Sequence, residues 1–368
     1  MRRYVQKSVS IRFVREVINM PDIKKYAAIN TKIKYLEGQL LTDEDYENLL
    51  NKENVEDIMQ FLKEKPVYGE LLNDDIDETS HNLAEFELLL LKNIVRHYEQ
   101  IILYFSGIYK KLLKSFLCRF EISDIKLLIK TAIKGEDVQS VSHSLIAFTK
   151  HATVDFNKLL QSKSLEDLIE NMSQTPYYNI LKPFLEESTD RQLFYMEMTL
   201  DQYYFRKLTS FIPKLEPEDR RILRKFIGSY IDLYNLQWIY RAKKLFNILP
   251  EEIYNYSLPR GYRFNEDAIK ELCYLNGSNE LIDKILNSKY GFLVDNIETR
   301  EIYMERRSKR FLYFLLLRYK KKEQFNIMEL MIYLHLLEYE MRDIISIIES
   351  HKYGYTVEHS KQFLIRKV

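Results

Sequence analysis

Common nucleotide-binding loops and serine nucleophile turns need glycines at short spacing, and this sequence has no such cluster. A phosphate-binding loop follows GxGxxG or GxxxxGK[ST], and a hydrolase serine follows GxSxG. The nine glycines are scattered instead, and the two nearest to each other are Gly277 and Gly291. We therefore expect no catalytic residue and no cofactor-binding residue of these kinds.

The histidines and cysteines give little support for a metal site. The seven histidines are scattered, none forms HExxH, and neither Cys118 nor Cys273 lies at the spacing of zinc ligands. His335 and Glu338 share a helix face and are the best candidate pair, but a partly buried histidine near a surface carboxylate is the commoner meaning of that spacing. We expect no metal, and we expect both cysteines in the core of a protein from a reducing compartment.

One carboxylate pattern recurs three times along the chain. In each copy an acidic residue precedes an Asp or Asn by three residues, and apolar residues share their helix face. The three pairs are Glu121 with Asp124, Asp232 with Asn235, and Glu340 with Asp343. Either these residues make polar contacts between helices that recur around an axis, or they lie on a solvated helix face.

Basic clusters are the remaining candidates for binding. Arg306–Arg310 and Arg318–Lys322 suit lipid head groups or an acidic partner, but acids surround both, so a solvated face is the alternative. Met1–Asn19 is also basic and lacks the apolar stretch of a secretory signal; it is either a poorly packed extension or a targeting or membrane-surface segment. With 55 basic and 54 acidic residues, the chain has no net field to attract nucleic acid.

The elements that position these residues are helices. Glycine (9) and proline (8) are scarce in 368 residues, so tight turns are few, whereas the abundant Leu, Ile, Lys and Glu suit helices. No apolar run reaches the ~18–20 residues of a membrane span. The 3.6-residue periodicity predicts helices at residues 22–41, 43–51, 55–64, 79–117, 121–134, 138–150, 155–161, 165–172, 188–213, 217–246, 250–254, 265–275, 279–287, 295–321, 324–350 and 355–364.

Two segments of the chain repeat each other without a gap. The segments are Leu49–Leu72 and Leu159–Phe184, and their matches include a shared Glu-Asp, a proline and a tyrosine. The matched positions are Glu56-Asp57 with Glu166-Asp167, Pro66 with Pro176, and Tyr68 with Tyr178. A third copy is weaker and keeps mainly Tyr290-Gly291, which corresponds to Tyr68-Gly69. Internal repetition of this kind indicates a modular fold.

We therefore predict an all-α protein of three similar helical domains. The predicted boundaries are a basic extension at residues 1–20 and helical repeats at 21–137, 138–248 and 249–368, the last of them divergent. Solenoid repeats have roughly 20–45 residues, so these much longer units indicate three domains packed side by side. The expected architecture is a pseudo-threefold, funnel-shaped arrangement.

Three stretches carry a resemblance to a known family. The first runs from Tyr26 to Leu41 and continues to Tyr68-Gly69-x-Leu71. The second is Asp232–Lys243 with the following Leu258-Pro259-x-Gly261, and the third is Glu338–Ile344. Their order over residues 21–366 resembles the C subunit of the V/A-type rotary ATPases and ATP synthases, a family whose eukaryotic member is the d subunit of the V-ATPase.

The resemblance implies a non-catalytic, funnel-shaped helical subunit of the central stalk. Such a subunit lies on the cytoplasmic face of the membrane as a peripheral part of the complex. Its partners would be the central rotor shaft subunits and the membrane proteolipid ring, with no nucleic acid, no cofactor and no direct small-molecule substrate. It would couple ATP hydrolysis or synthesis to proton or sodium transport.

Two alternatives stay open from the sequence alone. One is a helical-repeat scaffold that binds other helical proteins and has no rotary role. The other is an enzyme with an unfamiliar site assembled between the units. A deep polar cleft with converging titratable groups would favour the enzyme, and a wide open funnel would count against it.

Overall fold

The computed structural model describes residues 23–73, 83–147, 151–187, 189–246, 248–322 and 326–367. These residues form helices and the turns between them, with no β-strand. The predicted all-α class is confirmed, and the predicted extension at residues 1–20 lies outside the described residues. Among the helices of these ranges, none is both long enough and apolar enough to cross a membrane.

Long helices form the frame of the described chain. They are α6 (Leu83–Ile102), α7 (Gly107–Ile133), α11 (Thr189–Phe211), α12 (Pro217–Lys244), α16 (Arg300–Lys322) and α17 (Ile327–Lys352). The start of α12 agrees with its predicted start, because Pro217 occupies the first turn and the acids Glu218 and Asp219 follow it. Acids are favourable there because the first turn carries the positive end of the helix dipole.

Shorter helices connect the long ones. They are α2 (Ile23–Glu37), α3 (Asp43–Leu50), α4 (Val55–Lys63), α5 (Pro66–Asn73), α8 (Phe156–Leu159), α9 (Leu165–Glu170), α10 (Pro176–Leu181), α13 (Pro250–Asn255), α14 (Glu266–Tyr274), α15 (Gly277–Leu286) and α18 (Val357–Phe363), with 3₁₀ turns η1 (Val138–Ser144), η2 (Lys182–Glu186), η3 (Ile212–Lys214) and η4 (Gly291–Leu293). The predicted start of the helix at residues 43–51 is confirmed. Thr42 and Asp45 form a reciprocal capping box at the start of α3.

One predicted helix boundary is misplaced. The sequence pattern puts a break at residues 118–120, but α7 runs through them, and the chain breaks instead at residues 103–106. Gly107 has a φ of +54°, which glycine adopts at low cost, and the extended Ser106 precedes it. Apolar residues occupy both places, so periodicity does not locate the break. The Ser106-Gly107 dipeptide is the local signal that does.

Two further segments differ from their predicted structure. Helices α5 and α10, predicted as connections, each begin at a proline, Pro66 and Pro176. Proline ends a helix when it lies inside one, but it is well tolerated at the first helical position, where its missing N–H needs no partner. Residues 138–144 form a 3₁₀ turn rather than the predicted α-helix over 138–150.

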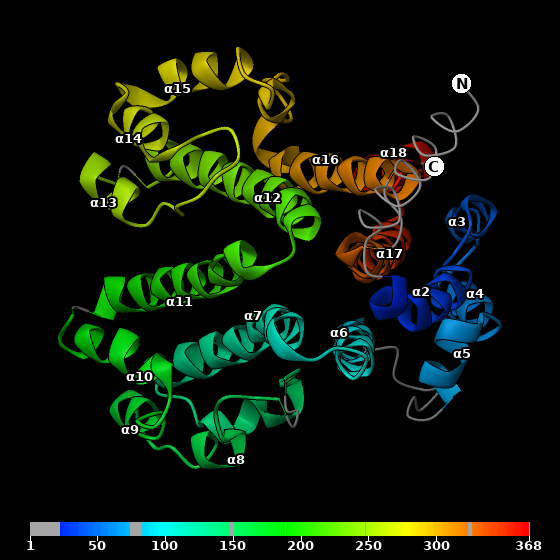
Figure 1. The fold of residues 1–368 in the computed structure, drawn as a ribbon, viewed down its shortest axis with the longest axis horizontal. Helices are drawn as coiled ribbons and strands as arrows, with labels where there is room; N and C mark the ends of the chain where they lie inside the picture. Colours follow the sequence, from blue (N-terminus) through cyan, green and yellow to red (C-terminus); the bar gives the residue numbers. More distant parts are fainter. Residues whose placement is uncertain are drawn as a thin grey trace, which may run out of the picture.

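The long helices lie in three groups, which are α7 with α11, α12 with α16, and α6 with α17 (Figure 1). Helix α7 packs along α11, and α8–α10 lie beside this pair. Helix α12 packs against α15 and α16, and α17 packs against α2, α6 and α16. The division into three domains with the predicted boundaries stays a prediction, and so does the funnel shape.

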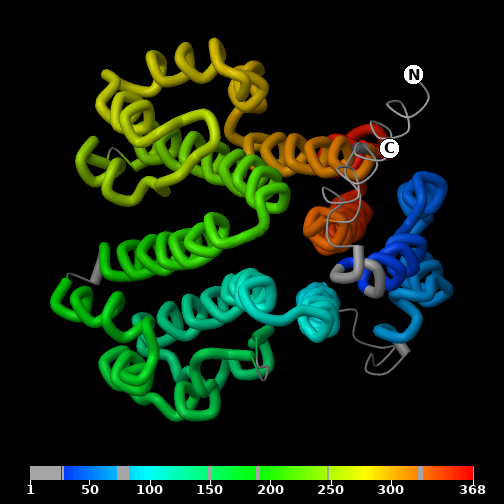
Figure 2. The backbone as a smooth tube through the Cα atoms, in the orientation of Figure 1, coloured from blue at the N-terminus to red at the C-terminus, as the bar shows by residue number. Residues whose placement is uncertain are grey.

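Segments from opposite ends of the sequence share one of these groups. Figure 2 shows the blue tube of the N-terminal helices beside the orange and red tube of α17 and α18, and α17 packs against α2 and α4. The Arg366 guanidinium donates to the Leu41 carbonyl at 2.7 Å and to Asp43 at 2.8 Å. Lys361 pairs with Glu47 at 2.7 Å. Polar contacts therefore accompany the packing between these two segments.

Candidate functional site

Glu121, Asp232 and Glu340, here called the recurring acids, are buried. They lie on α7, α12 and α17 with 4 %, 0 % and 3 % of their surface exposed. A buried carboxylate needs hydrogen-bond donors in place of water. Of the two alternatives left open by the sequence, the solvated helix face is therefore wrong. The polar contacts do recur, but most of their partners lie in connecting segments rather than on other long helices.

Glu121 shows the arrangement within one stretch of chain. Its Oε1 accepts from the backbone N–H groups of Thr153 and Val154, at 2.9 Å from Val154, and its Oε2 accepts from the Tyr177 hydroxyl at 3.0 Å. The two N–H groups precede α8, whereas Tyr177 lies in α10. One carboxylate therefore holds two parts of the short-helix segment against α7.

Asp232 makes the same kinds of contact on α12. It accepts from the backbone N–H of Arg263 at 2.8 Å and of Phe264 at 3.2 Å, and from the Tyr290 hydroxyl at 2.9 Å. Gly261 permits this approach, because a Cβ there would lie 2.1 Å from Asp232 Oδ1. The chain turning past Asp232 consequently requires glycine at position 261.

Glu340 repeats the pattern across the sequence. It accepts from the backbone N–H of Leu41 at 2.8 Å and from the Tyr68 hydroxyl at 2.7 Å. Both donors belong to α2–α5 and their connections, here called the N-terminal helical segment. They lie 299 and 272 residues away from Glu340. The third copy of the arrangement thus joins two distant segments, where the other two copies join neighbouring ones.

The second residue of each recurring pair binds backbone further along the chain. Asp124 accepts from the N–H groups of Ile146 and Ala147, the latter at 2.6 Å, and Asp343 accepts from Ile365 at 2.6 Å and Arg366 at 3.0 Å. Asn235 uses its amide instead and exchanges two 2.8 Å hydrogen bonds with the backbone of Leu258. These bonds satisfy N–H groups that a buried turn would otherwise leave unpaired.

The tyrosine of the second copy lies one residue from its predicted match. The repeat pairs Tyr68 with Tyr178, but it is Tyr177 that reaches the recurring acid, while Tyr178 contacts Glu170 near the surface. Tyr68 lies two residues after the first proline of its helix, and Tyr177 lies one residue after its own. The tyrosine that binds the recurring acid therefore stands at a different position in each helix. An alignment of the two repeats without a gap cannot pair these two tyrosines.

Burial changes the acidity of these carboxyl groups. It raises the pKa of Glu340 and of Asp343 to about 7 each, although the hydrogen-bond donors around them act in the opposite direction. Burial also raises the pKa of Asp124 to about 6. The folded chain consequently binds protons at these sites more tightly than the unfolded chain.

We expect Asp343→Asn to reduce the pH dependence of stability. Because its folded pKa is raised, Asp343 stabilises most below its unfolded pKa of about 4, and this contribution is lost as the pH rises through 7. Asparagine keeps an oxygen as the acceptor for one of the two N–H groups that Asp343 binds, and it loses the other hydrogen bond at every pH. Between pH 5 and 8 the parent should lose roughly 2 kcal/mol more unfolding free energy than the variant. Urea unfolding at both pH values measures the difference, and identical losses would contradict it.

Two buried histidines do not disturb this comparison. Burial lowers the pKa of His97 and of His335 to about 4, so both favour the folded state above pH 6.5 and oppose folding as the pH falls. Both remain in the variant and in the parent. Their effect therefore cancels when the two proteins are compared at the same pH.

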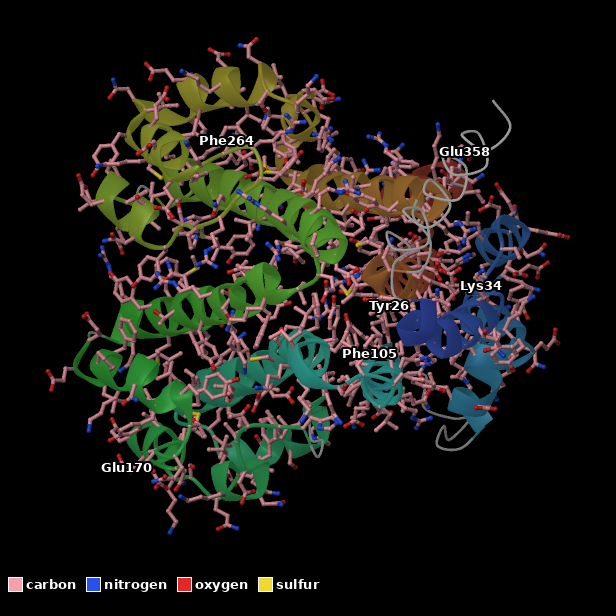
Figure 3. The ribbon with its side chains drawn as sticks, in the orientation of Figure 1. Tyr26, Lys34, Phe105, Glu170, Phe264 and Glu358 are labelled. Carbon is pink, nitrogen blue, oxygen red and sulfur yellow. The ribbon has the colours of Figure 1, made fainter. Side chains whose placement is uncertain are left out.

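Asp219 connects the starts of three long helices. This buried carboxylate in the first turn of α12 accepts from the Tyr109 hydroxyl of α7 at 2.5 Å and from the Ile327 N–H at the start of α17 at 2.9 Å. The Tyr26 hydroxyl of α2 donates to it at 2.7 Å. Tyr26 lies near Phe105 in the middle of the molecule (Figure 3), with ring centroids 6.0 Å apart. The beginnings of α7, α12 and α17 therefore converge on one acid.

A second contact between long helices lies further along. Arg119, Tyr230 and Glu338 each stand two residues before the recurring acid of their helix. Arg119 of α7 pairs with Glu338 of α17 at 2.7 Å, and Arg342 lies 3.4 Å from the same carboxylate. Burial acts to raise the pKa of Glu338, but the two guanidinium groups outweigh it and lower that pKa to about 2. This ion pair links two of the three groups of helices.

His335 and Glu338, the candidate metal pair of the sequence, make separate contacts. The Nδ1 atom of His335 lies 2.8 Å from the Met331 carbonyl oxygen, and its ring packs edge-on against Phe226. Glu338 is engaged by arginine instead. No group of three or more potential metal ligands occurs in the described ranges of the chain. These contacts place His335 in the core.

The first basic cluster is mostly engaged inside the protein. Arg307 donates to the Leu293 carbonyl at 3.2 Å, Arg310 donates to the Ile365 carbonyl at 3.1 Å, and Lys309 pairs with Glu305 at 2.5 Å. These side chains are half-buried, so a solvated face does not describe them. In the second cluster, Lys320 pairs with Glu37 of α2 at 2.9 Å.

A cavity of about 680 Å³, here called the central cavity, adjoins the Arg119–Glu338 pair. Most of its lining comes from α6, α7, α12, α16 and α17, and so from all three groups of long helices; Ile146, Phe363 and Ile365 complete it. Ile302 and Tyr230 line it with 69 % and 38 % of their surface exposed. Two smaller cavities of about 310 and 270 Å³ lie elsewhere in the described structure. The central cavity is thus open, wide and lined by both apolar and charged groups.

Sequence reasoning found the recurring acids but missed Asp219 and Arg119. In the sequence, Asp219 cannot be distinguished from any other acid in the first turn of a helix. Arg119 had a usable signal, because Arg119, Tyr230 and Glu338 hold the same place relative to the three recurring acids. Aligning the three long helices on those acids would have placed an arginine and a glutamate at equivalent positions.

Comparison with known proteins gives a consistent result. A family model described as ATP synthase (C/AC39) subunit matches residues 29–363. The C subunit of the A-type ATP synthase of Methanosarcina acetivorans is 25% identical over 268 residues, 72% of this chain and 71% of the relative. Those of Archaeoglobus fulgidus and Methanocaldococcus jannaschii are 26% and 25% identical over 285 and 271 residues, covering 75% and 73% of this chain and 77% and 67% of the relatives.

Proposed function

The chain belongs to the ATP synthase (C/AC39) subunit family, and we propose that it is a non-catalytic subunit in the central stalk of a V/A-type rotary ATPase. It forms a socket that links the central rotor shaft to the membrane proteolipid ring. It lies at the cytoplasmic face of the membrane and couples ATP hydrolysis or synthesis to ion transport. The family match over residues 29–363 carries this proposal.

The internal contacts support a role in transmitting torque. A coupling part must not yield under load, and close-packed helices have low compressibility. Asp219 holds the starts of α7 and α17 against α12, and the Arg119–Glu338 pair holds α7 against α17. The recurring acids in turn fix the connecting segments to these helices. Force applied to one group of helices would thus pass to the others through buried contacts.

The central cavity supports a socket rather than an enzyme site. It is open to solvent and bounded by all three groups of long helices. Among the acids that line it, Glu338 is held in the ionised form by two arginines, which suits a structural ion pair. A general acid or base works best with a pKa near the operating pH. Burial raises the pKa of Asp343, another lining acid, to about 7, but both of its carboxylate oxygens accept from the backbone N–H groups of Ile365 and Arg366.

Separate binding experiments test the proposal. The rotor shaft subunits and the detergent-solubilised proteolipid ring of the same ATPase are purified and immobilised in turn, and binding of this chain to each is measured. We expect saturable binding to both. Binding to neither would refute the proposal. A helical scaffold without a rotary role would instead bind an unrelated protein far more tightly than either.

A further inference from the structure

Three lysines line the cavity of about 310 Å³, here called the lysine cavity. They are Lys111 and Lys114 of α7 and Lys207 of α11. Glu121 is the one acid among the described residues that line it, and its carboxylate already accepts hydrogen bonds from two backbone N–H groups and a tyrosine hydroxyl. The lining therefore carries an excess of positive charge, and its acid is occupied elsewhere.

None of these lysines has a carboxylate partner among the residues that the structure describes. The interface of the same two helices does contain such a pair, because Lys126 of α7 binds Asp201 of α11 at 2.6 Å. Lys207 instead lies 3.5 Å from the Cys118 sulfur, with its ammonium 5.4 Å from the centre of the Tyr203 ring. Burial raises the pKa of the Cys118 thiol, so that neighbour is neutral. A half-buried cation thus lacks a counterion within the described chain.

The three ammonium groups converge from two helices. Lys111 and Lys114 are three residues apart and share a face of α7, and Cys118 follows one turn later on that face. The contact of Lys207 with Cys118 therefore places its ammonium beside the same face. Lysines suit a phosphate, whose oxygens accept charged donors from several directions, whereas a planar carboxylate is matched best by arginine. Among the described residues, the lining of this cavity includes no arginine.

The rest of the lining is largely apolar. Val95, Phe120 and Phe211 contribute to it from α6, α7 and α11. Beside it, the turn that joins α6 to α7 holds Leu103 and Tyr104, with 65 % and 49 % of their surface exposed. A free phosphate ion gains nothing from apolar walls, but a phospholipid does. Exposed leucine and tyrosine next to a phosphate site suit the interface of a bilayer.

We propose that the lysine cavity binds an anionic phospholipid, with its phosphate among Lys111, Lys114 and Lys207 and the beginning of its acyl chains against the apolar walls. The volume of about 310 Å³ lies at the lower end of the ~300–1,000 Å³ range of ligand pockets, which suits a head group rather than a whole lipid. Leu103 and Tyr104 enter the bilayer interface beside it. Lipid binding here needs neither the rotor shaft nor the proteolipid ring, so the full chain alone serves for the tests.

Vesicle binding by matched variants tests the site. The full chain should float with phosphatidylglycerol vesicles at physiological salt but not with phosphatidylcholine vesicles. Lys207→Met keeps the apolar stem and should weaken this binding at least tenfold, because it removes a half-buried partner of the phosphate. Lys111→Met changes an exposed side chain that the core does not need, and should weaken binding about threefold to tenfold. Lys130→Met removes one charge from an exposed position of α7 outside the cavity and should leave binding unchanged.

Brominated lipid locates the acyl chains. Phe211→Trp places an indole in the lysine cavity, and Phe314→Trp places one at a 44 % exposed position of α16 outside it. The native Trp238 lies outside the cavity and contributes the same emission to both variants. Vesicles of brominated phosphatidylglycerol should quench the added emission of the first variant by at least half and leave that of the second unchanged.

Several results would overturn lipid binding at this cavity. One is absence of binding to phosphatidylglycerol vesicles, and another is equal quenching of the two introduced indoles. Equal weakening by Lys207→Met and Lys130→Met would indicate attraction by the charged surface as a whole. Displacement of the chain from vesicles by micromolar inorganic phosphate would show that the cavity takes a soluble phosphate instead of a lipid. All of these leave the proposed function standing, because binding to the shaft and to the ring is measured separately.

Discussion

Replacing Asp219 by alanine should lower the unfolding free energy by about 4 kcal/mol, because several buried donors lose one shared acceptor. The donors are the hydroxyls of Tyr26 and Tyr109 and the N–H of Ile327. Each buried donor left unsatisfied costs about 1–3 kcal/mol. The contact also joins α2, α7 and α17 to α12, so its loss loosens four helices at once. Urea unfolding followed by circular dichroism measures the change.

Matched variants show whether the effect belongs to this contact. Asp57 occupies the corresponding position in the first turn of α4 but is exposed, so Asp57→Ala should cost less than about 1 kcal/mol. Tyr26→Phe removes one donor and should cost about 1 kcal/mol in the parent. In the Asp219→Ala background it should cost clearly less, because the hydroxyl has already lost Asp219 as an acceptor and keeps only its contact with Tyr109. Additive effects of the two substitutions would contradict the shared contact.

The sequence was informative where structure depends on local chemistry. The scarcity of glycine and proline predicted an all-helical chain, and the helix predicted to begin at residue 43 does begin there, after the cap formed by Thr42 and Asp45. Pro217 did the same for α12. These signals work because a cap or a proline acts on its own few residues. At residues 118–120 apolar periodicity misled, since a helix buried on several sides has no single apolar stripe.

The recurring acids were found in the sequence, but their burial could not be read from it. A polar residue on an amphipathic helix faces water unless another segment covers it, and the covering segment is distant or irregular. For Glu340 it is the turn at Leu41, 299 residues away. The partners of Asp219 likewise come from other helices, among them α2, 193 residues away along the chain. Such tertiary contacts leave no periodic trace in a single sequence.

The residues that line the central cavity could not be predicted from the sequence for the same physical reason. Most of its lining comes from five long helices, and no two of its wall residues Arg119, Arg306 and Glu338 belong to the same helix. The basic cluster around Arg306 was visible, but acids nearby favoured a solvated face. Only the folded structure separates Arg306, which lacks an acceptor, from neighbours that have one.

Glu340→Ala should destabilise the protein by about 3 kcal/mol and release the N-terminal helical segment from α17. The substitution leaves the Leu41 N–H and the Tyr68 hydroxyl without their acceptor, at about 1–3 kcal/mol each. Hydrogen exchange measures the release directly, as lost amide protection at Leu41 and across α3–α5. Glu340→Gln keeps one carbonyl oxygen as an acceptor and should lose less than half as much stability.

Glu121→Ala provides the comparison that isolates the effect of chain connectivity. Glu121 bonds Val154 and Tyr177, only 33 and 56 residues away, whereas the donors to Glu340 are 299 and 272 residues away. Reforming a contact costs more conformational entropy when more chain separates its partners. Glu121→Ala should therefore cost a similar free energy of unfolding but open residues 153–177 less often than Glu340→Ala opens residues 41–73. Equal loss of protection in the two segments would mean that packing of α17 against α2 and α4, rather than Glu340, holds the two distant segments together.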